Sequence, residues 1–148
     1  MAKTPTVSFR AEFPVDAEFD HPPGATLARE LQAKLSRELA EVREFDNWRD
    51  CGWSIDGLVE STPVQVFFTQ VNIPTGAPLW LLGCTSGRHV SILARLLGRA
   101  PDDSAAVLQL ARAVDQILKS EARVSEVKWY MNDRWRGPDD REWVDAPS

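Results

Sequence analysis

One short segment of the sequence holds the residue types that nucleophilic and anion-binding chemistry uses. Cys84 ends the apolar run 79–84, and three small residues, 85–87, separate it from Arg88 and His89. A thiolate attacks electrophiles when nearby cations lower its pKa, and an arginine can hold two oxygens of an anion at once. The segment therefore raises the question of a cysteine-based active site.

The spacing within this segment argues against that chemistry. The order of strand, cysteine, small residues, arginine and helix resembles the loop of thiolate phosphatases, but that loop is longer between its cysteine and its arginine. Three residues are too few to direct several backbone N–H groups at a phosphate. We therefore predict that Cys84 is a buried packing residue, as free cysteines commonly are. A small enzyme, or a binder of an anion or other small ligand, that uses Cys84, Arg88 and His89 is kept as the alternative.

Other catalytic and metal-binding patterns are missing from the sequence. It has no glycine-rich phosphate loop, no dinucleotide fingerprint and no serine nucleophile elbow, so we expect no cofactor. Cys51 and Cys84 lack the spacing of zinc ligands, and we expect them to be free thiols. The acidic residues of 16–20 lack the glycine and the final glutamate of a calcium loop. We expect no catalytic residue and no metal ligand.

Length and charge limit the partners. The chain has 148 residues and a net charge of −5, which disfavours binding to a nucleic-acid backbone and favours a protein partner with a basic surface. It has no apolar run of membrane-spanning length and no recognisable signal peptide, so we expect a cytoplasmic protein that does not bind membranes.

The hydrophobic periodicity predicts the elements that must position these residues. Alternation predicts a strand around Val7 and Phe9, and three further strands joined by short turns in 51–84. A leucine stripe predicts a helix over 25–42. A short helix then ends at Gly98, a longer one starts at Asp102, Asp103 or Ser104, and a last short strand covers 124–131. We expect the core to contain Phe9, Leu31, Leu35 and Val114.

These elements predict an α+β fold. The order β-α-β-β-β-α-α-β gives a two-layer sandwich in which the helices cover one face of a mostly antiparallel sheet. We expect one domain over 1–131 and a polar C-terminal tail over 132–148. The second face of the sheet is then open unless a partner or another copy covers it.

Four aromatic residues are the candidate contacts for a partner. Phe67 and Trp80 alternate with apolar neighbours in their strands, and this phase predicts that both lie on the open face of the sheet. Trp135 and Trp143 lie among charged residues of the tail, where a role in binding and a role in closing the tail onto the domain are equally consistent with the sequence. We therefore predict a non-enzymatic protein–protein interaction module, for example a bacterial immunity or adaptor protein. Its partner would be another protein or a second copy of itself.

Overall fold

The sheet is built from six strands in which every pair of neighbours is antiparallel. The computed structural model describes residues 4–19, 21–39, 41–48, 51–88, 91–99, 101–131 and 135–148. The strands are β1 (Thr6–Arg10), β2 (Glu41–Trp48), β3 (Gly52–Val59), β4 (Thr62–Val71), β5 (Leu79–Ser86) and β6 (Ser125–Tyr130). Their order across the sheet is β2-β3-β4-β5-β1-β6, and the pairing confirms the predicted α+β fold.

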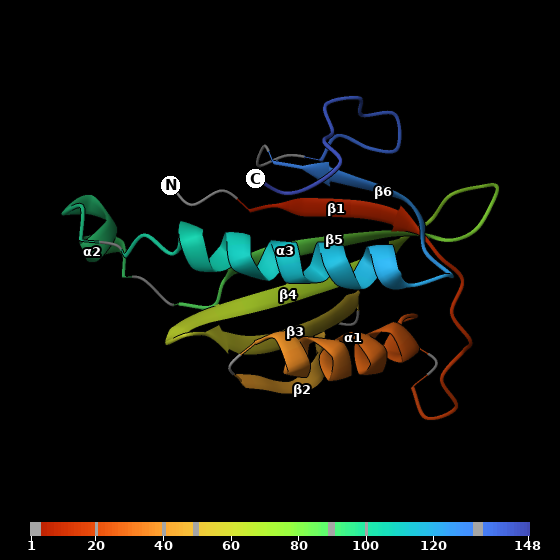
Figure 1. Cartoon of the computed structure of the whole chain (residues 1–148), viewed down its shortest axis with the longest axis horizontal. Coiled ribbons are helices and arrows are strands. Elements are labelled where there is room, and N and C mark those ends of the chain that lie inside the picture. Colours follow the sequence, from red (N-terminus) through yellow and green to blue (C-terminus); the bar gives the residue numbers. More distant parts are fainter. Residues whose placement is uncertain are drawn as a thin grey trace.

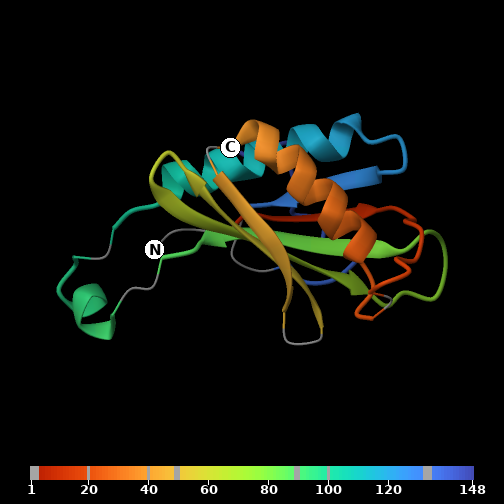
Figure 2. The same ribbon diagram turned by 90° about the horizontal axis from the view of Figure 1, so that it is seen from below.

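Two helices cover one face of this sheet (Figures 1 and 2). Helix α1 (Ala25–Glu38) packs on β2 and β3, and α3 (Ser104–Ser120) packs on β3 to β6. Leu31 and Leu35 of α1 are buried, as are Val114 of α3 and Phe9 of β1. The predicted core residues are therefore confirmed.

The predicted element order is wrong at one place. The leucine stripe does not continue to residue 42, because α1 ends at Glu38 and the segment Glu41–Trp48 forms the edge strand β2. A bulge between Val42 and Phe45 changes the register against β3. The bulge turns the side chains of Val42 and Phe45 toward the helices. Their partners in β3, Gly57 and Ile55, are two residues apart and therefore lie on the same face of the sheet.

The third helix, α2 (Ile92–Leu96), is not part of the helical layer. It lies beyond one end of the sheet (Figures 1 and 2). The prediction that the helices cover one face therefore holds for α1 and α3 and fails for α2.

The last strand is joined to α3 by a buried polar contact. The Trp129 Nε1–H donates to Asp115 Oδ1 over 2.8 Å, and Lys119 Nζ lies 3.0 Å from the same carboxylate group. Trp129 is fully buried. Because the indole N–H and the carboxylate are both paired, neither adds the penalty of an unsatisfied buried group.

Candidate functional site

Cys84 and Arg88, two of the residues that the sequence suggested for nucleophilic chemistry, are not brought together. Cys84 lies in β5 with its side chain fully buried in the core, and burial raises the pKa of its thiol far above the usual range. Arg88 is exposed in the segment after β5 and pairs with Asp103. His89 lies outside the described residues. The prediction that Cys84 is a packing residue is confirmed.

The reactivity of the two cysteines offers a test of this placement. Cys51 is exposed and Cys84 is buried, so a thiol reagent at neutral pH should label Cys51 quickly and label Cys84 only as fast as the protein unfolds. Mass spectrometry of the Cys51→Ser variant, with and without denaturant, isolates the Cys84 signal. Rapid labelling of that variant in its native state would contradict the burial of Cys84.

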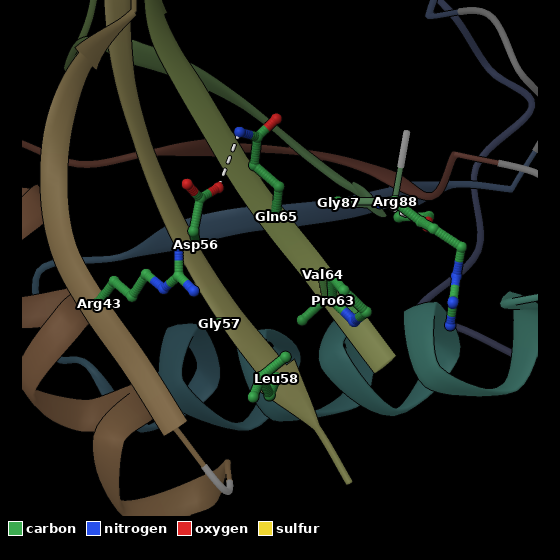
Figure 3. A pocket seen from close by; sticks show the side chains of 10 residues that line it. Arg43, Asp56, Gly57, Leu58, Pro63, Val64, Gln65, Gly87 and Arg88 are labelled. Carbon is green, nitrogen blue, oxygen red and sulfur yellow. Dashed lines mark hydrogen bonds between the residues drawn. The ribbon is translucent and has the colours of Figure 1, made fainter. Parts of the chain in front are cut away.

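Arg88 instead borders a cavity of about 480 Å³ on the open side of the sheet (Figure 3). Arg43 extends from β2 toward Asp56 of β3, and Asp56 accepts a hydrogen bond of 2.9 Å from the Gln65 side chain of β4. The lining mixes polar side chains, among them two arginines and one carboxylate, with apolar ones, and the size of the cavity is within the range of small-ligand sites.

The two strand aromatics do not share a face. Trp80 pairs with Phe9 of β1, and its side chain points into the core with 3% of its surface exposed. Its indole N–H donates to the Ala11 carbonyl over 2.8 Å. The prediction that Trp80 lies on the open face is therefore wrong. Phe67 does lie on the open face, where it is half-buried and its ring covers Gly83.

The C-terminal tail folds back onto the domain. Val144 exchanges both backbone hydrogen bonds with Trp129 of β6, and Lys119 Nζ donates to the Asp145 carbonyl over 2.7 Å. Trp143 remains 40% exposed, with Lys128 Nζ 5.4 Å from the centre of its ring. Trp135 is half-buried, and its buried Nε1 has no hydrogen-bond partner among the described residues.

Among the described residues, four exposed apolar side chains gather on the short helix α2 and directly after it, at positions that the sequence did not suggest as a site. Ile92, Leu93, Leu96 and Leu97 are 79%, 66%, 78% and 55% exposed. Contiguous apolar surface of this kind is uncommon on a monomer and usually marks a binding site. The signal in the sequence was the run ILARLL itself, which is too short for its periodicity to show whether a sheet or solvent lies beside it.

The segment that carries α2, residues 87–103 and here called the α2 loop, is closed at its base. Asp103 lies at the start of α3 with 7% of its surface exposed. Its Oδ2 accepts hydrogen bonds from Ser86 Oγ over 2.6 Å and from Arg88 Nε over 3.1 Å. The carboxylate therefore holds the end of β5 beside the start of α3, and the apolar side chains project from a fixed base.

Removing the Asp103 carboxylate should loosen the contact between the end of β5 and the start of α3. We expect Asp103→Ala to lower the free energy of unfolding by about 1–3 kcal/mol, because the Ser86 hydroxyl and the Arg88 guanidinium lose their partner. Hydrogen–deuterium exchange should become faster in 91–99 through local opening, and in β1 only by as much as the loss of global stability allows. Asp103→Asn is the matched variant: it keeps an acceptor for Ser86 and should show a smaller effect. Unchanged exchange in Asp103→Ala would contradict this role.

No metal site is present among the described residues, because no group of three or more His, Cys, Asp or Glu side chains is close enough to hold an ion. Of the acidic segment 16–20, Asp16 and Glu18 pair with Arg29, and Asp20 lies outside the described residues. None of the helices described here is long and apolar enough to cross a membrane.

Comparison of the chain with protein-family models, with curated proteins and with solved structures gave no match.

Proposed function

We propose that this protein is a non-enzymatic protein–protein interaction module, and that the α2 loop is its principal docking element. The observation that carries the proposal is the exposure of Ile92, Leu93, Leu96 and Leu97 at the tip of a loop with a fixed base. A protein pocket that received these four side chains would remove a large apolar area from water. The fixed base favours binding because less conformational entropy is lost when the partner docks.

The open face and the tail remain part of the proposal as secondary contacts. Phe67 is half-buried there and Trp143 is exposed, whereas the burial of Trp80 removes it as a direct contact. The net charge of −5 for the whole chain favours encounter with a basic partner and weaker binding at high salt. We propose a cytoplasmic location, where the thiols of Cys51 and Cys84 would stay reduced.

Site-specific photo-crosslinking tests the proposal. A photoreactive amino acid at position 93, in the cells that make the protein, should give covalent adducts with protein, identified by mass spectrometry. The same group at Glu60, which is exposed in the turn between β3 and β4, is the matched control. No protein adduct at position 93 above the control would refute the proposal.

Stability measurements separate docking from folding. The double variant Leu93→Ser/Leu96→Ser should keep its free energy of unfolding within about 0.5 kcal/mol, because both side chains are already exposed to water. In the same cells it should lose adducts formed through a photoreactive group at Ser91. A large loss of stability in urea unfolding would show instead that the two leucines pack within the domain.

A second candidate function rests on the cavity beside Arg43 and Arg88. We propose, as this alternative, binding of a small anionic ligand by the two arginines, with Gln65 as a further donor. Titration calorimetry with inorganic phosphate should then give saturable heats that Arg43→Ala abolishes, while Arg37→Ala, at an exposed position of α1, retains them. Absence of saturable binding in the unmodified protein would reject this alternative.

A further inference from the structure

Two exposed apolar regions lie at opposite ends of the molecule. One is the tip of the α2 loop. The other is the segment between β1 and α1, where Val15 is 80% exposed and Phe19 is 38% exposed. Both views place these regions at opposite ends of the long axis (Figures 1 and 2). The α2 loop therefore cannot reach the second region within the same chain while its base is held at Asp103.

The second region borders a cavity of about 470 Å³, here called the aromatic cavity. Its apolar wall is a cluster of three rings, Phe19, Phe45 and Trp53, in edge-to-face contact with centroids 5.5–6.3 Å apart. The Arg29 guanidinium lies over two of these rings and pairs with Asp16 at 2.7 Å. The wall is thus preformed and held in place by contacts within the chain.

Carboxylates form the rim of the aromatic cavity. Glu18, Glu44 and Asp46 line it, and Arg29 is the one cation among its lining residues. Arg29 already pairs with Glu18, whereas Glu44 has no ion pair among the described residues. The cavity thus combines an apolar wall with an excess of negative charge, which suits an apolar ligand that carries positive charge.

The α2 loop has this complementary chemistry. Its tip, from Ser91 to Arg99, contains Arg95 and Arg99 and no aspartate or glutamate, whereas Arg88, Asp102 and Asp103 lie at its two ends. The other large cavity is lined by Arg43, by Arg88 of the loop itself and by one carboxylate, so it offers the loop no excess of negative charge. Contact between two α2 loops would place positive charge against positive charge. Among the surfaces described here, charge selects the aromatic cavity.

We infer that the α2 loop of one copy docks at the aromatic cavity of a second copy of this chain. Leu93 and Leu96 would contact the aromatic wall, and Arg99 would face Glu44 and Asp46. This rests on the proposed function, in which the α2 loop docks on protein, and it adds that the partner is the same protein. Because the donor and acceptor surfaces lie at opposite ends of one copy, two copies side by side in opposite directions would form the contact twice, as an isologous pair.

A mixing experiment with the purified full-length protein tests the inference. The donor variant is Leu93→Ser/Leu96→Ser, and the acceptor variant is Glu44→Lys/Asp46→Lys, all at exposed positions. In sedimentation velocity, each variant alone should lose self-association, with a dissociation constant raised by about tenfold or more. Mixed one to one, they should regain a complex, because the donor variant keeps its cavity and the acceptor variant keeps its loop.

Two controls make the test specific. Glu60→Lys/Asp139→Lys changes the net charge by the same amount at exposed positions away from the cavity, and it should associate like the unmodified protein. Circular dichroism should show that all variants are folded. Added salt should weaken association of the unmodified protein.

Each opposite result overturns the inference. A second copy is excluded as the partner if the unmodified protein stays monomeric at high micromolar concentration. It is also excluded if the acceptor variant associates normally or if the mixture of the two variants stays monomeric. If position 93 then crosslinks to a different protein, the proposed function survives and this inference fails. If the loop gives no protein adduct and binds vesicles of anionic lipid, both fail.

Discussion

Replacing Trp80 with alanine should lower the free energy of unfolding by about 3–5 kcal/mol, the range for removing a buried aromatic side chain. The Trp80 ring is in edge-to-face contact with Phe13 and Phe68, at centroid distances of 6.0 and 6.2 Å. Its N–H donor is paired with the Ala11 carbonyl. The substitution leaves both a cavity and an unsatisfied acceptor, so the two penalties add.

Phe67→Ala is the matched comparison for Trp80→Ala. Phe67 lies in the neighbouring strand β4, on the opposite face of the sheet, and is only half-buried. We therefore expect a clearly smaller loss of stability, measured by urea unfolding of both variants under the same conditions. Equal losses would mean that the open face is as well covered as the core, and the assignment of the two faces would be wrong.

The placement of Trp80 could not be predicted from its strand alone. In the run LWLLGC, residues of both alternation phases are apolar, and Leu79 and Trp80 are both buried. Alternation reveals a face only when one phase is polar. The pairing with β1 decides the question, because Trp80 is opposite Phe9 and Leu82 is opposite Val7, and all four side chains are in the core.

The edge strand β2 was missed for a different physical reason. Its apolar residues Val42, Phe45 and Trp48 are three apart, which is the spacing of a helix and not of a strand. The bulge between Val42 and Phe45 explains the first of these two spacings, since one additional residue in the strand keeps Val42 and Phe45 on the helix-covered face. Periodicity cannot reveal a bulge before the pairing with β3 is known.

The helix α1 and the strands within 51–84 were predicted correctly because each has its full pattern in the local sequence. The leucines of α1 recur at helical spacing over several turns, and 51–84 combines strand-forming residues with turn residues. The candidate binding surface had no such pattern. A run of six residues cannot show that α2 lies away from the sheet. Its exposure depends on how Asp103 joins the end of β5 to the start of α3. Surface sites of this type require tertiary structure.

The second large effect is expected at the leucine stripe of α1. Leu31→Ala and Leu35→Ala should each lower the free energy of unfolding by about 2–5 kcal/mol, because each removes methyl groups from a closed core and leaves a cavity behind. Both side chains are 1% exposed and belong to the core cluster between α1, α3 and the sheet. Alanine favours the helix intrinsically, so the loss comes from packing and not from helix propensity.

The matched control for these variants is Leu93→Ala in α2. The chemical change is the same and the residue is also helical, but Leu93 is 66% exposed, so we expect a change within about 0.5 kcal/mol. Urea unfolding of the three variants at a protein concentration low enough to avoid self-association measures the contrast. A loss below about 1 kcal/mol at both Leu31 and Leu35 would mean that the stripe of α1 faces solvent. A loss at Leu93 as large as theirs would mean that α2 packs against the domain, and the α2 loop could then not serve as the docking element.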